Sequence, residues 1–264
     1  MKAMLLAIAN VFALLWQVVP ERLRLYTFKA LFVLESRGNN PRVALKRLFA
    51  IQDEWEKIVS ERATALGGGE HPKHRLIHYH DFFIDRITDG QRVLDVGCGY
   101  GAVARSIARA RPASAVTGLD NDIGRLTQAR NSNNPANLNY VETDATKSVP
   151  SGPWDVVVLS NVLEHIADRI GFLKALVSTT GAAHFLIRVP LFERDWKMPM
   201  RREVGANYYS DPDHKIEPTQ AEFRTETAAA GLVVEELITP WGEIWASLKV
   251  ANKVANKGAN KGAP

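Results

Sequence analysis

The part of this sequence best suited to chemistry is the glycine-rich segment VLDVGCGYG at residues 93–101. Gly97, Gly99 and Gly101 have no Cβ, so a ligand can approach the backbone closely there. The helix expected to start next offers free backbone N–H groups, which bind negative or polar groups. Because Gly97, Gly99 and Ala102 also satisfy the dinucleotide pattern G-x-G-x-x-A, the turn alone does not identify its ligand.

Three acidic residues at the ends of neighbouring expected strands narrow the choice of ligand. Asp95 precedes Gly97 by two residues, where a carboxylate suits a cationic group and would repel a pyrophosphate. Asp120 ends the next strand, 19 residues beyond Gly101, and can hold both hydroxyls of a ribose. Asp144 follows a third strand, in a position to bind an adenine amino group. The alternative role for such acids is to cap a helix or to stabilise a turn.

Alternating strands and helices must position these residues, and they occupy the chain from residue 92 onward. Short apolar or β-branched runs bounded by turn residues indicate strands, and the stretches between them indicate helices. This alternation is typical of a parallel sheet covered by helices on both faces. LVVEELI and EIWASLKV, on either side of residues 239–242, predict a closing hairpin. The expected strands are 92–96, 115–119, 138–142, 154–159 and 184–189, and the expected helices are 101–111, 122–131 and 163–178.

From residue 93 to residue 250, the chain resembles the class I S-adenosylmethionine-dependent methyltransferases. Asp95 and the three glycines match the family's first motif, and Asp120 matches its ribose-binding acid. Asp144 and the alanine after it match the adenine-side pair. WDVVVLSNVLEHI at 154–166 matches the fourth-strand motif of the branch that acts on small molecules. One loop departs from this branch, because STTGAAH precedes the fifth strand in place of the usual Gly-Gly turn.

The resemblance implies an α/β fold, namely a Rossmann-like, seven-stranded, mostly parallel sheet with an antiparallel last strand. It implies an enzyme that transfers a methyl group, with S-adenosyl-L-methionine as the cofactor. An oxidoreductase is disfavoured by the carboxylate of Asp95. The cofactor-binding residues that the resemblance implies are Asp95, Gly97, Gly99, Gly101, Asp120, Asn121, Asp144, Ala145 and Ser160.

Histidines are the candidates for the proton transfer that methylation of an alcohol requires. His165 follows the fourth strand in NVLEH, and ligands of open α/β sheets bind at the carboxyl ends of the strands. His214 lies in SDPDHKIEPTQAEF, an insertion after the fifth strand that is expected to cover the acceptor. We expect His165 and His214 to be catalytic and favour His165, whose alternative role is pairing with a nearby acid. The expected substrate-binding residues are Tyr79, His80, Glu164, Arg188 and Tyr208.

No metal site is expected from the sequence. Cys98 is the single cysteine, which excludes an intramolecular disulfide and a cysteine-based metal site and favours a reducing compartment. We interpret Cys98 as a small apolar residue of the glycine-rich turn. Four histidines lie within ten residues of HPKHRLIHYHDFFIDRI, and a single helix there would make His74 and His78 neighbours. That pair is a possible zinc site. We prefer the interpretation that this segment, just before the first strand, covers the cofactor or lines the acceptor pocket.

The N-terminal region is apolar and basic. Residues 4–19 form an apolar run of 16 residues, shorter than the roughly 20 that a spanning helix needs. ERLRLYTFKALFVLESR follows and is typical of a helix that lies in a membrane interface, although packing on the body or dimerisation would also explain it. Residues 1–50 hold eight Lys or Arg and two acids, and residues 251–264 hold three Lys, so in a chain of net charge +4 the body at 51–250 carries a charge of −5. This distribution disfavours nucleic acid as a partner and favours an anionic membrane surface, contacted through residues 1–36.

We therefore expect three regions: a helical, membrane-associated extension at 1–70, the methyltransferase domain at 71–250, and a disordered basic tail at 251–264. The positive-inside rule places the body in the cytoplasm, peripheral to or anchored in the inner membrane. The chain is similar to bacterial methyltransferases of glycan assembly, which implies a sugar or lipid-linked glycan hydroxyl as the acceptor. A quinone or other lipid methyltransferase is the alternative, and a non-catalytic cofactor-binding scaffold is the alternative of another class. The oligomeric state is left open.

Overall fold

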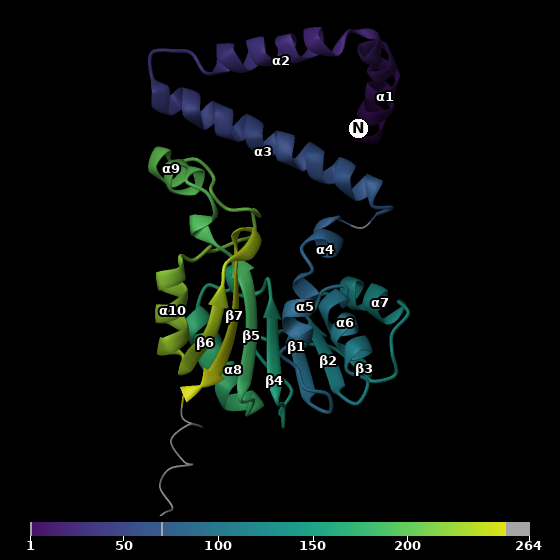
Figure 1. The fold of residues 1–264 in the computed structure, drawn as a ribbon, viewed down its shortest axis with the longest axis vertical. Helices are drawn as coiled ribbons and strands as arrows, with labels where there is room; N and C mark the ends of the chain where they lie inside the picture. The colour runs from purple at the N-terminus through teal and green to yellow at the C-terminus, as the bar shows by residue number, and fades with distance from the viewer. Residues whose placement is uncertain (1, 70, 252–264) are drawn as a thin grey trace, which may run out of the picture. The chain divides into compact units, whose positions relative to one another are not determined.

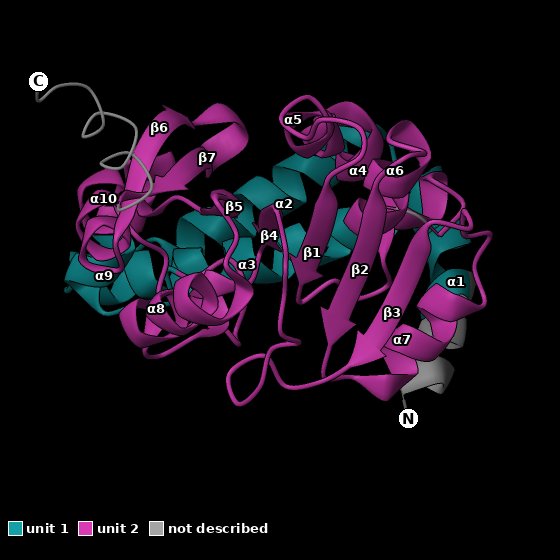
Figure 2. Cartoon of the chain, turned by 90° about the horizontal axis from the view of Figure 1, so that it is seen from below, with its two compact units in different colours: residues 1–62, 200–208 teal, residues 63–199, 209–264 magenta. Residues whose placement is uncertain are grey.

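The computed structural model describes residues 2–69 and 71–251, with side chains from residue 9 onward except that of Val11. The chain divides into two compact units (Figure 2). The first comprises residues 1–62 and 200–208, and the second comprises residues 63–199 and 209–264. Apart from Ala251, the predicted tail at 251–264 lies outside the described residues.

The second unit contains a seven-stranded sheet in the order β3-β2-β1-β4-β5-β7-β6. The five strands from β3 to β5 pair in parallel, whereas β7 runs antiparallel to both β5 and β6. The predicted Rossmann-like α/β fold with an antiparallel last strand is confirmed. The strands are β1 (Arg92–Val96), β2 (Ala115–Asp120), β3 (Leu138–Glu142), β4 (Val156–Ser160), β5 (His184–Pro190), β6 (Leu232–Ile238) and β7 (Glu243–Val250).

Helices cover both faces of this sheet (Figure 1). Alternate side chains of a strand point to opposite faces, so Val157 of β4 packs with α8 and α10 while Val158 packs with α5 and α6. Both faces are buried, which explains why the central strands read as continuous apolar runs. The helices of the second unit are α4 (Lys73–Leu76), α5 (Tyr79–Ile84), α6 (Ala102–Ala110), α7 (Ile123–Arg130), α8 (Arg169–Thr180) and α10 (Gln220–Ala229), with 3-10 turns at Leu163–His165, Phe192–Arg194 and Pro240–Gly242. Most of α9 (Lys197–Val204) belongs to the first unit.

Two helices differ from those that the sequence predicts: one is interrupted and the other starts later. The single helix expected through the four histidines is wrong, because His78 adopts a left-handed conformation with φ 49° and separates α4 from α5. His74 and His78 therefore do not face each other along one helix. The helix expected at 163–178 starts later, at Arg169, where the Asp168 side chain accepts a hydrogen bond from the Gly171 N–H. The residues before it, Leu163–His165, form a 3-10 turn directly after β4.

The first unit consists of α1 (Lys2–Val18), α2 (Glu21–Glu35), most of α3 (Pro41–Leu66) and residues 200–208. None of the fifteen residues of α2 is buried. Arg201 ties the last segment to α3, because its guanidinium lies over the Phe49 ring and forms an ion pair of 2.8 Å with Asp53. Across the described part of the chain, no helix combines the length and apolar character needed to cross a membrane.

Candidate active site

The glycine-rich turn links β1 to α6 in the conformation that its sequence predicts. Gly99 and Gly101 both have positive φ, 55° and 71°. A Cβ on Gly101 would lie 2.1 Å from the Tyr140 hydroxyl oxygen, whereas a Cβ on Gly99 would meet no described atom within 4 Å. The Gly99 N–H donates to Oδ2 of Asp120 at 2.7 Å. Gly101 thus serves packing, while the open side of Gly99 is available to a ligand.

A cavity of about 360 Å³ opens at the carboxyl ends of β1, β2 and β4, a size that suits a small-molecule cofactor. Its lining contains six of the residues predicted for the site, and they come from the ends of four different strands. The other four cofactor predictions, Asp95, Gly99, Gly101 and Ser160, are not among the described lining residues. The six that line it are Gly97, Asp120, Asn121, Asp144, Ala145 and His165.

The acids of this cavity are held in place by backbone groups. Asp120 is buried, and its second carboxylate oxygen accepts from the Asp122 N–H at 2.9 Å. Asp144 accepts from both the N–H and the hydroxyl of Thr146, at 3.0 and 2.6 Å. Hydrogen bonds from Lys147 and Thr146 lower the pKa of Asp144 to about 2, so this carboxylate is charged at neutral pH.

Asp95 is buried beneath the turn. Burial raises its pKa to about 7, although a backbone hydrogen bond from Ala104 acts in the opposite direction. Its Oδ2 atom has no hydrogen-bond partner within the described chain. An unpaired buried carboxylate oxygen is costly unless a donor reaches it, and the ammonium group of an amino-acid-bearing cofactor is such a donor. The residue therefore fits the cationic end of S-adenosylmethionine.

On the acceptor side, the structure brings together Glu164, His165 and His214. Glu164 is fully buried, and neither of its carboxylate oxygens has a hydrogen-bond partner among the described residues. The rings of His165 and His214 meet edge to face, with centroids 4.9 Å apart. Nδ1 of His214 lies 2.9 Å from Oε1 of Glu217, and the Lys215 N–H donates to the Glu164 carbonyl at 2.7 Å. The insertion that carries His214 is thus fastened to the turn that carries Glu164.

The pKa values of the two histidines are shifted in opposite directions. Partial desolvation and the neighbouring His214 lower the pKa of His165. Burial acts to lower the pKa of His214 as well, but the hydrogen bond to Glu217 and the charges of Glu164 and Glu217 raise it overall. Burial also raises the pKa of Glu164 to about 7. The lowered pKa favours the neutral form of His165, which can accept a proton.

His165 also lines a second cavity, of about 450 Å³. This cavity shares Thr146, Ile166 and Phe172 with the cofactor cavity and adds apolar surface from α8, including Ala175. Because His165 belongs to both linings, it lies where a molecule in the second cavity would meet the cofactor.

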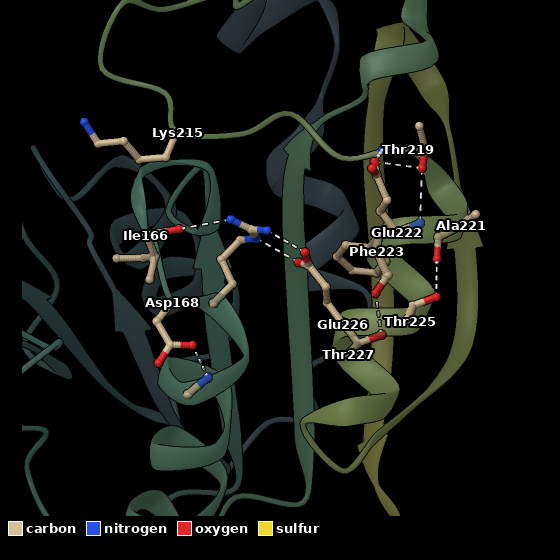
Figure 3. Close-up of polar contacts among 12 residues, drawn as sticks. Ile166, Asp168, Lys215, Thr219, Ala221, Glu222, Phe223, Thr225, Glu226 and Thr227 are labelled. Atoms are coloured by element: carbon tan, nitrogen blue, oxygen red, sulfur yellow. Dashed lines mark hydrogen bonds and ion pairs between the residues drawn. The ribbon is translucent and has the colours of Figure 1, made fainter.

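Polar contacts between α8 and α10 stabilise the structure next to these cavities (Figure 3). Arg169 donates to both carboxylate oxygens of Glu226, at 2.7 and 2.5 Å, and to the carbonyl of Ile166. Thr219 and Glu222 form a capping box that starts α10 directly after the insertion. The C-terminal end of the insertion is therefore attached to a helix that is itself fixed to α8.

Three of the predicted substrate-binding residues form a separate group around α5. The Arg188 guanidinium lies 3.9 Å over the Tyr79 ring and donates to both carboxylate oxygens of Glu243, at 2.6 and 2.5 Å. Arg188 also reaches the Ser160 hydroxyl at 3.4 Å. The His80 ring packs against Tyr79 with centroids 4.3 Å apart, and burial lowers its pKa to about 4. The charge of Arg188 is thus compensated by Glu243, and the contacts of this group hold α5 to β5 and β7 inside the sheet.

Some residues of the site were not anticipated from the sequence. Asp211 and Asp213 line the cofactor cavity, and Glu217 orients His214. The only signal for them was their place beside His214 in the acidic stretch SDPDHKIE. Tyr208 belongs to the first unit, so its role in the site stays a prediction.

Comparison with known proteins gives the class of this chain. The model of a family described as "Methyltransferase domain" matches residues 69–237, and the chain belongs to that family. Together with the site, this defines an S-adenosylmethionine-dependent methyltransferase with S-adenosylmethionine as its cofactor.

Sequence relatives include proteins named "Ubiquinone biosynthesis O-methyltransferase". The one from Aeromonas salmonicida is 31% identical over 172 residues, covering 58% of this chain and 70% of the relative. The one from Pectobacterium atrosepticum is 32% identical over 162 residues, covering 58% of this chain and 65% of the relative. The match therefore leaves about a third of each relative's length outside it.

Solved structures show the same fold. A methyltransferase solved with the Haloferax volcanii Trm112 methyltransferase activator superposes with a TM-score of 0.56 at 18% identity, covering 72% of this chain and 96% of that chain. The S-adenosylmethionine-dependent methyltransferase SibL superposes with a TM-score of 0.55 at 20% identity, covering 69% of this chain and 56% of that chain. At these identities the likeness concerns the fold alone.

Proposed function

We propose that this enzyme methylates a hydroxyl group of a small-molecule acceptor. The observation that carries the proposal is the position of His165, which lines both the cofactor cavity and the adjacent second cavity. A base between the two cavities can reach the acceptor oxygen as it attacks.

S-adenosylmethionine supplies a methyl group on a positively charged sulfur: an O–C bond forms, the S–C bond breaks with its electron pair left on sulfur, and the hydroxyl proton is released. His165 accepts that proton on a ring nitrogen. Glu164 accepts a hydrogen bond from a second, neighbouring hydroxyl of the acceptor and so orients the reacting oxygen, which gives a partner to a carboxylate that has none among the described residues. His214, held by Glu217, fixes the orientation of the His165 ring.

The cofactor residues are assigned by position in the proposed complex. Asp120 and Asn121 bind the ribose, and Asp144 with Ala145 binds the adenine side; all four line the cofactor cavity. Asp95 and the glycine-rich turn receive the methionine portion, which is supported by the unpaired Oδ2 atom of Asp95.

For the acceptor, we favour a phenolic hydroxyl on a quinone-type lipid. The names of the relatives from Aeromonas salmonicida and Pectobacterium atrosepticum support this class. The apolar side chains of Ile166, Phe172 and Ala175 in the second cavity support it too, since they suit an aromatic ring. A sugar hydroxyl of a lipid-linked glycan is the second candidate, and it is favoured by the two-histidine cluster because an alcohol needs a base more than a phenol does.

We also propose that residues 1–70 act as an extension that attaches the catalytic region, 71–250, to the cytoplasmic face of the inner membrane. The support comes from α2, where exposed Leu25 and Phe28 alternate with basic Arg24 and Lys29. Apolar side chains can enter the headgroup boundary while the basic ones meet anionic lipids.

The acceptor assignment is tested with purified full-length protein and isotopically labelled S-adenosylmethionine. A prenylated dihydroxybenzene and a lipid-linked sugar are offered separately, and label transfer is followed by mass spectrometry. We expect an O-methyl product from the dihydroxybenzene. A product from the sugar alone selects the second candidate, and transfer to nitrogen or carbon in other acceptors, with both hydroxyl compounds unmodified, contradicts the hydroxyl assignment.

A further inference from the structure

Within residues 2–69 and 71–251, one group of three side chains can offer ligand atoms to a metal ion. Glu164, His165 and His214 each present one such atom, and these atoms lie within 4.8 Å of one another. Ligand atoms of a tetrahedral zinc site are about 3.3 Å apart, given metal–ligand distances of about 2.0–2.1 Å. Small side-chain rotations therefore bring the three within range of a single ion.

The unpaired carboxylate of Glu164 points independently to a cation. The residue is fully buried, and both of its oxygens are without a hydrogen-bond partner in the described structure. The cationic Arg188 is already paired with both oxygens of Glu243. A buried carboxylate is stable when it is paired or when it binds a metal, so a cation between Glu164 and the histidines would compensate the charge of this carboxylate.

The surroundings of His214 are those of a metal-binding histidine. Its Nδ1 is hydrogen-bonded to Glu217, which also accepts from the N–H and hydroxyl of Ser210 and pairs with Arg194. A carboxylate on one ring nitrogen fixes the tautomer and leaves Nε2 as the ligand. The backbone hydrogen bond from Lys215 to the Glu164 carbonyl sets the spacing between the two loops that carry the ligands.

We propose that Glu164, His165 and His214 bind a divalent transition-metal ion of the zinc class, with Glu217 orienting His214 from outside the ligand set. Two imidazoles and a carboxylate suit zinc, whereas magnesium and calcium prefer oxygen ligands alone. Three protein ligands would leave a fourth position open, and one of the three, His165, lines the cofactor cavity. When bound, the ion supplies Lewis acidity to an oxygen in that position.

This inference concerns binding and does not rest on the proposed acceptor. A ring nitrogen cannot hold a proton and a metal ion at once, so the metal-free and metal-loaded forms of the enzyme differ in the group that acts on the acceptor proton. Tests of His165 as a base therefore belong in chelator-treated protein, and tests of the metal site need a readout other than turnover.

The test is calorimetric titration of ZnCl₂ into untagged, chelator-treated full-length protein, with Co²⁺ as a spectroscopic substitute. We expect one ion per chain and a tetrahedral Co²⁺ absorption spectrum. Glu164→Gln and His214→Ala should each weaken Zn²⁺ binding at least tenfold, and Glu217→Gln should weaken it by about 10–100-fold. S-adenosylmethionine affinity, measured on every variant, verifies that each one folds.

Two matched histidine controls complete the design. His184→Asn changes a histidine at the start of β5, at the opposite end of the sheet, and should leave the Zn²⁺ affinity unchanged. His74→Asn removes a member of the N-terminal histidine group and should do the same. Unchanged affinity in both Glu164→Gln and His214→Ala, loss of binding in His74→Asn alone, or no stoichiometric binding to the wild-type protein would overturn the proposal.

Discussion

At the scale of single residues, function depends on a few buried or partly buried groups whose charge is set by their neighbours. His165 is neutral because it is partly desolvated and lies beside His214. Asp144 is charged because Thr146 and Lys147 donate to it. The same residue types without these neighbours would lack these shifts, so the chemistry comes from position as much as from composition.

The first prediction concerns the base. In chelator-treated protein, His165→Ala should lower kcat by roughly 10²–10⁴ while S-adenosylmethionine affinity is retained, because the acceptor proton loses its receiver. His214→Ala should mainly raise the acceptor KM. Steady-state kinetics with the acceptor that the enzyme methylates give kcat and KM, and calorimetry gives the affinity for the cofactor. The reverse pattern would move the base to His214, and near-normal turnover in both variants would show that the acceptor ionises without help.

The second prediction concerns the ribose-binding acid. Asp120→Ala should weaken S-adenosylmethionine binding by about 1.5–3 kcal/mol, the size of a charge-assisted hydrogen bond, as measured by calorimetry. Asp155→Ala is the matched control, since Asp155 pairs with Arg92 at the amino end of β1. An Asp120 variant with wild-type affinity would remove this residue from the site.

At the scale of secondary-structure elements, the strands were the most predictable part. The sequence located β1 and β3 to the residue because each is a short run with apolar residues bounded by turn residues. The break at His78 was not predictable, because the left-handed conformation there accompanies the burial of Tyr79, Phe82 and Phe83 in the core. That packing is a tertiary effect with no local pattern in the sequence.

The residues of the candidate site also fall into those that the sequence predicted and those that it missed. Asp120, Asp144 and Ala145 were found because they follow strands at fixed motif positions. Asp211 and Glu217 were missed because the insertion has no periodic pattern, and it is held to Glu164 through backbone hydrogen bonds. Arg188 was expected to face a substrate, and its pairing with Glu243 depends on the register between β5 and β7.

The third prediction concerns two glycines of one turn that have different roles, one in packing and one in cofactor binding. Gly101→Ala should lower the free energy of unfolding by at least about 2 kcal/mol, because the new Cβ meets the Tyr140 hydroxyl and the left-handed φ adds strain. Gly99→Ala has room in the free protein and should cost about 1 kcal/mol of stability, with its main effect on cofactor affinity. Urea denaturation and calorimetry distinguish the two. Equal destabilisation by both substitutions would contradict this division of roles.

At the scale of the whole molecule, the chain separates a catalytic unit from a unit of long helices with exposed apolar side chains. Charge follows the same division, since residues 1–50 hold most of the excess of basic side chains. A separate basic and apolar unit is the arrangement expected when one part of a protein binds a surface and the other binds small molecules.

The fourth prediction tests this separation. Removing residues 1–36 should release the protein from phosphatidylglycerol vesicles, measured by co-flotation at low salt, because the exposed apolar and basic residues of α2 are lost. S-adenosylmethionine affinity should not change, which also shows that the shortened chain folds. If the full-length protein does not float with the vesicles, a packing or dimerisation role for these helices replaces the membrane role.

The hydrogen bonds of Asp120 have a consequence for the thermodynamics of cofactor capture. One carboxylate holds the Gly99 N–H and the Asp122 N–H, so the turn has its binding conformation before any ligand arrives. Little conformational entropy is then lost on binding, and association proceeds without a slow loop-ordering step. Amide hydrogen exchange at Gly99 should already be slow in the free enzyme, and S-adenosylmethionine should slow it only slightly further.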